Sequence, residues 1–157
     1  MLKIKSSKID SILDSLCLII LVGTLIFIIG MWSKMSNQIP RHYDINGNID
    51  EIGSKTGVIY SYIITLIMYI FMSMVEKFAS IWQSEVKERE ENKDKLYTTA
   101  LHFLSFIKFL IVFEVACLIV CNALCYEPPK WILILSIEIL GGTVLYGIMK
   151  LFNIKLG

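Results

Sequence analysis

Four long apolar segments limit this chain to one kind of fold. They cover residues 12–32, 58–75, 101–124 and 131–149. Each comes close to the roughly 20 residues that a helix needs to cross about 30 Å of hydrocarbon. A bilayer offers no water to unpaired backbone groups, so only helices and closed barrels span it. The sequence therefore predicts an all-α, polytopic membrane protein, a bundle of four transmembrane helices that forms a single domain over residues 1–157.

The first apolar segment is expected to remain in the protein. Its core of about 20 residues exceeds the 7–15 residues of a signal peptide. The sequence Met31-Trp32-Ser33-Lys34 at its end also lacks small residues spaced for cleavage. Residues 12–32 are therefore expected to form the first helix.

Basic residues are distributed unevenly between the two sides of the predicted bundle. Ten lie on one side, namely Lys3, Lys5, Lys8, Lys77, Lys87, Arg89, Lys93, Lys95, Lys150 and Lys155. Four lie on the other side, namely Lys34, Arg41, Lys55 and Lys130. Cytoplasmic loops carry the excess of Lys and Arg, so both termini and the charged loop 76–100 are expected in the cytoplasm. The loop 33–57 then faces outward. The richness in Ile and Lys indicates a bacterial, AT-rich genome, so the expected location is the bacterial cell membrane.

The outward loop is polar and contains turn-forming residues. Pro40 disfavours helical geometry at the residue before it and so ends the first helix. Asn46-Gly47 is a strong turn signal, and Ile45 and Ile49 flank it symmetrically if residues 46–48 form a three-residue turn. The loop is therefore predicted to be a small hairpin or another compact structure.

The end of this loop is predicted to cap the second helix. Ser54 or Thr56 can accept hydrogen bonds from the free backbone N–H groups at the start of that helix. Lys55 is then placed at the water–lipid boundary, where it can reach lipid headgroups or an acidic side chain.

Carboxylates and a histidine in the loop raise the question of a metal site. Residues 44–48, Asp-Ile-Asn-Gly-Asn, begin like an EF-hand calcium loop, but Ile49 replaces the required Gly and Lys55 replaces the bidentate Glu. A transition metal is chemically conceivable, and the weak candidate ligands are His42, Asp44, Asp50 and Glu51. A polar turn in water explains the same residues, so neither a metal nor a cofactor is predicted.

The loop resembles the signature of a bacterial membrane family of unknown function that forms the N-terminal module of SdpI-type immunity proteins. That signature reads Pro-x-His-aromatic-Asn-x-x-Gly-x-x-Asp-x-aromatic-Gly-Ser-Lys. The matching residues are Pro40, His42, Tyr43, Gly47, Asp50, Gly53, Ser54 and Lys55. Asp44 stands in place of the Asn, and Ile52 in place of the second aromatic residue. The resemblance marks the matching residues, with Asp44 and Asn46, as the candidate ligand-binding set.

The resemblance also implies a function. SdpI-type proteins are multipass membrane proteins that protect a producer cell against its own secreted peptide toxin and can hold a cytoplasmic repressor at the membrane. The implied partners are an extracellular peptide toxin or signal, membrane lipid and a cytoplasmic repressor. SdpI-type proteins have further helices after the shared module, and a shared fold does not settle function.

Three ionisable residues interrupt the later apolar segments: Lys108, Glu114 and Glu138. A charge at the bilayer centre costs at least about 2–3 kcal/mol, so such residues rarely face lipid. At about 1.5 Å per residue, Glu114 and Glu138 can share a level, whereas Lys108 lies roughly 9 Å deeper and can instead snorkel toward the cytoplasm. The two Glu residues predict either an acidic pocket for a cation or protons, or polar bonds that lock the bundle.

Further features are interpreted as structural. Cys117, Cys121 and Cys125 follow one face of the third helix, where small side chains suit helix packing. His102 is expected to be an interfacial residue at the start of that helix. Charged residues with i, i+4 spacing in loop 76–100 indicate solvated extensions of the second and third helices.

Together these features predict a non-enzymatic bacterial membrane protein that recognises an extracellular peptide toxin or signal through the outward loop. The alternative is a small transporter or ion-coupled carrier component that uses Glu114 and Glu138. An enzyme is not expected, because the sequence has no evident nucleophile–base pair and no His-Glu-x-x-His motif. The net charge of +1 gives no reason to expect nucleic acid as a partner.

The predicted orientation can be tested by cysteine labelling. In a background in which the four native cysteines are replaced by serine, Asn48→Cys should react with an impermeant thiol reagent in intact cells, because it faces outward. Asn92→Cys should react only after permeabilisation. The reverse labelling pattern would contradict the orientation and remove the basis for extracellular recognition.

Overall fold

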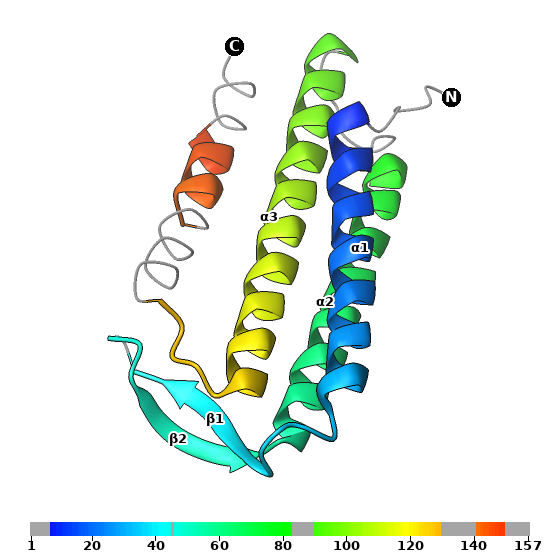
Figure 1. Ribbon diagram of the computed structural model, residues 1–157. Coiled ribbons are helices and arrows are strands. Elements are labelled where there is room, and N and C mark those ends of the chain that lie inside the picture. Colours follow the sequence, from blue (N-terminus) through cyan, green and yellow to red (C-terminus); the bar gives the residue numbers. More distant parts are fainter. Residues whose placement is uncertain (1–6, 45, 83–89, 130–140, 150–157) are drawn as a thin grey trace.

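The computed structural model describes residues 7–44, 46–82, 90–129 and 141–149. In chain order the elements are α1 (Lys8–Met31), β1 (Gln38–Tyr43), β2 (Ile49–Ser54), α2 (Thr56–Trp82) and α3 (Glu90–Leu124). The three long helices run side by side, and the two strands form a hairpin at one end of the bundle (Figure 1). We call this the hairpin end, and the end that holds the start of α1 the far end.

Three helical segments are long and apolar enough to cross a membrane: Lys8–Met31, Thr56–Lys77 and Thr98–Leu124. They correspond to the first three predicted spans. The predicted fourth span lies outside the described residues except for a short helix at 141–149, so the described residues contain three candidate membrane helices.

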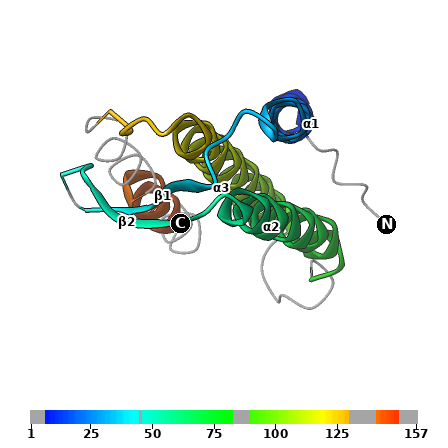
Figure 2. The same cartoon turned by 60° about the horizontal axis from the view of Figure 1, so that its bottom comes forward.

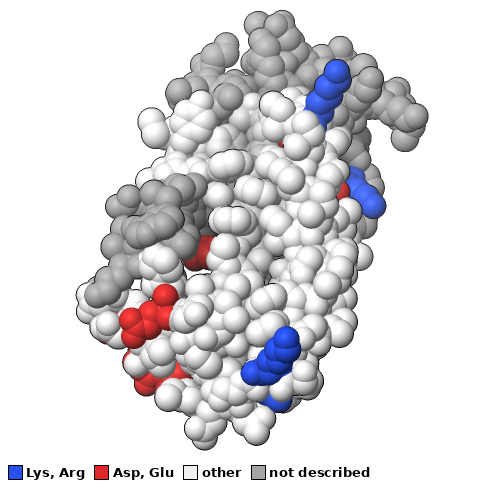
Figure 3. Space-filling view, in the orientation of Figure 1, with Lys and Arg blue, Asp and Glu red and all other residues white. Residues whose placement is uncertain are grey.

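The outer faces of the helices suit contact with lipid. Large apolar side chains are exposed along α1 and α2, including Ile19, Ile26, Ile29, Ile64, Ile67 and Phe71. On the face seen in Figure 3 the surface along the helices is mostly uncharged, and acidic side chains gather at the hairpin end. This pattern supports a membrane protein, because a water-soluble bundle would cover such faces.

α3 is the centre of the bundle. α1 and α2 each pack along α3 and touch one another at only a few points. Figure 2 shows the three helices with the hairpin end turned forward. One buried cluster near the hairpin end consists of Ile28, Ile39, Val58 and Ile119, and a second consists of Cys17, Leu21 and Val112. Lipid tails are as apolar as these side chains, so the association of membrane helices depends on close packing and polar contacts.

At the far end the helices extend beyond the predicted spans. α2 continues to Trp82 and α3 begins at Glu90, so most of the predicted charged loop 76–100 is helical. This agrees with the expected helical extensions. It also moves Glu76 from the predicted loop onto α2.

The predicted hairpin is present, and its strands correct the expectation of an all-α fold. β1 and β2 pair in antiparallel orientation, with Pro40 opposite Ile52 and Tyr43 opposite Ile49. The pairing is irregular around His42. Since a bulge re-aims the side chains next to it, this irregularity affects the direction of the His42 side chain.

The turn of the hairpin differs in register from the predicted one. The Asp44 N–H donates to the Asn48 carbonyl at 2.9 Å, so these two residues close the turn, and the predicted turn at 46–48 begins too late. Gly47 has a φ of 82°, a conformation that glycine adopts without steric cost. Gly47 therefore provides the positive φ at the turn, in line with the Asn46-Gly47 turn signal.

α3 ends in a cap that usually contains glycine. Cys125 has a φ of 55°, its N–H donates to the Asn122 carbonyl at 3.1 Å, and the Tyr126 N–H donates to the Cys121 carbonyl at 2.9 Å. These bonds satisfy the last carbonyls of the helix in a Schellman motif. A non-glycine residue in this conformation costs roughly 1–2 kcal/mol.

The hairpin turn should depend on Gly47. Gly47→Val should disorder the hairpin at a cost of about 1 kcal/mol or more, because a β-branched residue does not tolerate this φ. The variant should reach the membrane at normal levels, and limited proteolysis should cleave it faster within residues 38–54. Gly57→Ala is the control, since a Cβ there meets no atom within 4 Å. Equal cleavage of Gly47→Val and wild type would contradict this account of the turn.

Candidate functional site

The exposed part of the hairpin carries two polar side-chain pairs. His42 Nδ1 lies 2.7 Å from Asp50 Oδ1, and Arg41 lies 3.4 Å from the Glu51 carboxylate. All four side chains are exposed to solvent. Exposed pairs contribute only about 0–1 kcal/mol to stability, so these side chains can exchange their partners for those of a ligand.

Tyr43 ties the hairpin to α3. Its hydroxyl donates to Asn122 Oδ1 at 2.5 Å and lies 3.3 Å from the Tyr126 carbonyl. Burial raises the pKa of Tyr43 to about 12, so the hydroxyl remains a donor at neutral pH. This motif residue therefore anchors the hairpin.

The other side of the hairpin base is held by α1. Ile39 is buried in the cluster that contains Ile28 and Val58. Lys55 Nζ donates to the Trp32 carbonyl at 3.3 Å and lies 5.0 Å from the centre of the Trp32 ring. Lys55 thus binds a carbonyl at the end of α1, where a cation is favourable.

Two further motif residues shape the step from β2 to α2. The Thr56 N–H donates to Ser54 Oγ at 3.4 Å, so the predicted capping by Ser54 is confirmed. A Cβ at Gly53 would lie 3.0 Å from Arg41 Cδ, so a side chain at Gly53 would crowd the Arg41 side chain.

Asp44 organises the turn. Its carboxylate accepts hydrogen bonds from the Asn46 N–H and Asn48 N–H, both at 2.8 Å, and from the Asn48 side chain at 2.9 Å. The Asn48 side chain is the largest of the causes that hold the pKa of Asp44 below its ordinary value. The stabilisation is therefore present at neutral pH and is lost as the pH falls through the lowered pKa.

The hairpin does not collect the weak candidate metal ligands at one point. His42 and Asp50 are brought together, whereas Asp44 is committed to the turn. Among the described residues, no three His, Cys, Asp or Glu side chains are placed to share an ion.

Two small cavities lie between the hairpin and the helices. Their volumes are about 330 and 270 Å³. Arg41, Ser61 and Asn122 line both. Polar groups from β1, α2 and α3 therefore converge beneath the exposed hairpin.

A second site lies inside the bundle, toward the far end. Lys108 on α3 is fully buried at 0% exposure. Its ammonium donates to Asp14 and Glu76, both at 2.8 Å, and to Ser73 at 3.2 Å, and it lies 5.2 Å from the Tyr69 ring centre. We call these five residues the Lys108 cluster. The sequence allows Lys108 to snorkel toward the cytoplasm, whereas in the structure its ammonium lies inside the bundle, where carboxylates compensate its charge.

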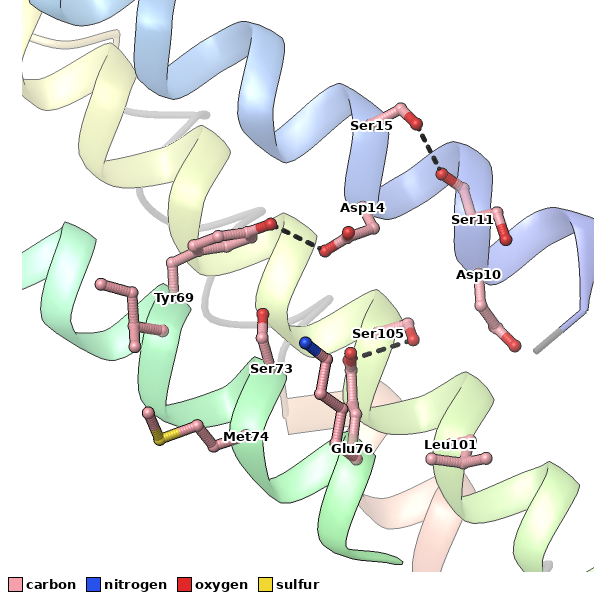
Figure 4. A pocket seen from close by; sticks show the side chains of 12 residues that line it. Asp10, Ser11, Asp14, Ser15, Tyr69, Ser73, Met74, Glu76, Leu101 and Ser105 are labelled. Atoms are coloured by element: carbon pink, nitrogen blue, oxygen red, sulfur yellow. Dashed lines mark hydrogen bonds between the residues drawn. The ribbon is translucent and has the colours of Figure 1, made fainter. Parts of the chain in front are cut away.

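The carboxylates of the cluster have further partners. Asp14 accepts from the Tyr69 hydroxyl at 3.0 Å, and Glu76 accepts from Ser105 at 3.1 Å (Figure 4). Sequence reasoning missed Asp14, which lies inside the first apolar segment, and Glu76, which follows the second. A signal was present, since ionisable residues within membrane helices commonly pair with one another.

His102 makes a similar contact nearby on α3. Its Nδ1 lies 2.5 Å from Asp10 Oδ1. The other Asp10 oxygen accepts from the Ser7 N–H at 3.1 Å within a capping box at the start of α1. His102 is half-exposed, and its interaction with Asp10 links the first turn of α1 to α3.

The predicted pair of intramembrane glutamates stays untested. Glu138 lies outside the described residues. Glu114 is half-buried on α3 and is not a member of the Lys108 cluster.

One family model matches part of the chain. The model of a domain of unknown function, DUF1648, matches residues 18–70, which include most of α1, the hairpin and half of α2. No curated protein and no solved structure shows significant similarity to the chain. The matched domain thus contains the hairpin motif and ends before Glu76 and Lys108.

Loss of the Lys108 charge should destabilise the bundle. Lys108→Met should lower the free energy of unfolding in detergent by about 3 kcal/mol, because it leaves two carboxylates without their cation. Glu114→Gln on the same helix should stay within about 1 kcal/mol of wild type. Adding Asp14→Asn and Glu76→Gln to Lys108→Met should restore part of the loss. Wild-type stability of Lys108→Met would contradict the assigned pairing.

Proposed function

We propose that this chain is a non-enzymatic, multipass bacterial membrane protein that recognises an extracellular peptide toxin or signal through the hairpin. The proposed role resembles that of SdpI-type immunity proteins. The observation that carries the proposal is the combination of an exposed, charged hairpin tip with a base fixed to α1 and α3. A peptide ligand would therefore meet a preorganised surface, which lowers the entropic cost of binding.

The surface has groups suited to a peptide. Arg41 and Glu51 present one charge of each sign, and His42 and Asp50 add a second polar pair. Among the described residues the sheet has two strands, so the edge of β2 away from β1 can accept an extended peptide by strand addition in this proposal. The excess of basic residues in the terminal and 76–100 segments supports an outward position for the hairpin.

The same orientation would place the far end in the cytoplasm. There α2 extends to Trp82 and α3 starts at Glu90, beyond the apolar spans at Lys77 and Thr98. These helical extensions are the surface on which a cytoplasmic repressor would dock in this proposal.

A small transporter or ion-coupled carrier component is the second candidate. The notable observation in its favour is the Lys108 cluster, since ionisable residues within membrane helices often mark ion or substrate pathways. In this alternative the cluster would act with the predicted pair Glu114 and Glu138.

A protection assay separates the two candidates. Cells lacking the protein are exposed to the peptide fraction of their own culture medium, with plasmid-borne variants supplied in trans. We expect wild type and Glu114→Gln to protect. The double variant His42→Ala, Asp50→Ala should lower the tolerated peptide dose at least tenfold at an unchanged membrane level, because it removes one of the two polar pairs of the tip and keeps the anchors.

The outcome for the hairpin variant decides the proposal. Full protection by His42→Ala, Asp50→Ala would contradict recognition by the hairpin tip. Loss of protection by Glu114→Gln, together with ion flux in liposomes that contain wild type, would favour the transporter.

A further inference from the structure

A cleft of about 880 Å³ opens between α1 and α2 beside the Lys108 cluster. It exists because both helices pack on α3 and scarcely touch each other. Asp14 and Tyr69 lie on one part of its wall, and Glu76 and Ser105 on another (Figure 4). Apolar side chains of Ile70, Met74 and Leu101 complete the lining. The cleft is therefore amphipathic.

The charges around the cleft favour a cationic ligand. Lys108 has three N–H donors, and all three are used by Asp14, Glu76 and Ser73. It has no donor left for an anion. The lining contains the carboxylates of Asp10, Asp14 and Glu76, against the single lining cation Lys77.

Asp14 is the carboxylate that can accept a further hydrogen bond from a ligand. Oδ1 accepts from both Lys108 and Tyr69, whereas Oδ2 has no hydrogen-bond partner among the described residues. The side chain is 43% exposed, and it lines the cleft. The carboxylate oxygens of Asp10 and Glu76, by contrast, all have partners: His102 and Ser7 for Asp10, and Ser105 and Lys108 for Glu76.

We propose that this cleft binds a protonated primary amine carried on an apolar body. The ammonium group would donate to Asp14 Oδ2, and the body would pack against Ile70, Met74 and Leu101. Asp14 lies about 9 Å along α1 from Lys8 at 1.5 Å per residue, a depth close to lipid headgroups. The amine can come from an aminophospholipid headgroup or from a free amphiphilic amine.

The test uses the full-length protein in maltoside micelles. Native mass spectrometry compares bound dioleoyl phosphatidylethanolamine with bound dioleoyl phosphatidylcholine, whose quaternary ammonium has no N–H donor. A thermal-shift titration compares hexylamine at pH 7 with hexanol. A preference of at least fivefold for phosphatidylethanolamine identifies the lipid source. A shift with hexylamine and not with hexanol, without a lipid preference, identifies the free amine.

Two variants locate the ligand. Asp14→Asn keeps an acceptor for Lys108 and Tyr69 and removes the charge, so amine binding should fall at least fivefold. Ile70→Trp fills the cleft without changing charge and should also reduce binding at least fivefold. Ile63→Trp is its control, because Ile63 is similarly exposed on α2 and does not line the cleft.

Two results would contradict the proposal that the cleft binds an amine. It fails if the protein binds phosphatidylethanolamine no better than phosphatidylcholine and hexylamine shifts the melting temperature no more than hexanol does. It also fails if Ile70→Trp binds as wild type does, a result that remains decisive should Asp14→Asn not fold.

Discussion

The ammonium group of Lys108 has to be neutralised inside an apolar bundle, and this constraint joins the three long helices. Asp14 contributes from α1 and Glu76 from α2, while those two helices have little direct contact. A buried ion pair does not by itself add much net stability, but removal of one partner is costly. The cluster therefore fixes which faces of α1 and α2 meet α3, and the cleft between them follows from this arrangement.

The opposite end of the bundle is organised by hydrogen bonds and a cation–aromatic contact. Tyr43 binds Asn122 of α3, and Lys55 binds the end of α1 at Trp32. With Ile39 buried between the helices, the hairpin base cannot move independently of the bundle. A ligand at the hairpin tip would thus act on a surface linked to both α1 and α3, which suits recognition coupled to the membrane helices.

The sequence predicted the parts of the fold that depend on local residue patterns, namely the long helices and the hairpin. Apolar length identified the helices, and Asn46-Gly47 identified the hairpin, because glycine adopts the required positive φ without steric cost. Sequence reasoning misplaced the turn by treating Ile45 as the partner of Ile49, since strand register depends on pairing across the whole hairpin. It missed the partners of Lys108, because depth along a helix does not reveal which residues on other helices face it. The role of Tyr43 as an anchor likewise depends on Asn122, far away in the sequence.

The most direct test of this account measures the distance between α1 and α2 at the far end. Nitroxide labels at Ile12 and Val75, on exposed positions of a cysteine-free protein in bilayers, should give a narrow distance distribution. Lys108→Met should broaden it, while labels at Ile29 and Tyr60 near the hairpin end keep their narrow distribution. An unchanged narrow distribution between the far-end labels in Lys108→Met would contradict the claim that Lys108 holds α1 and α2 in place.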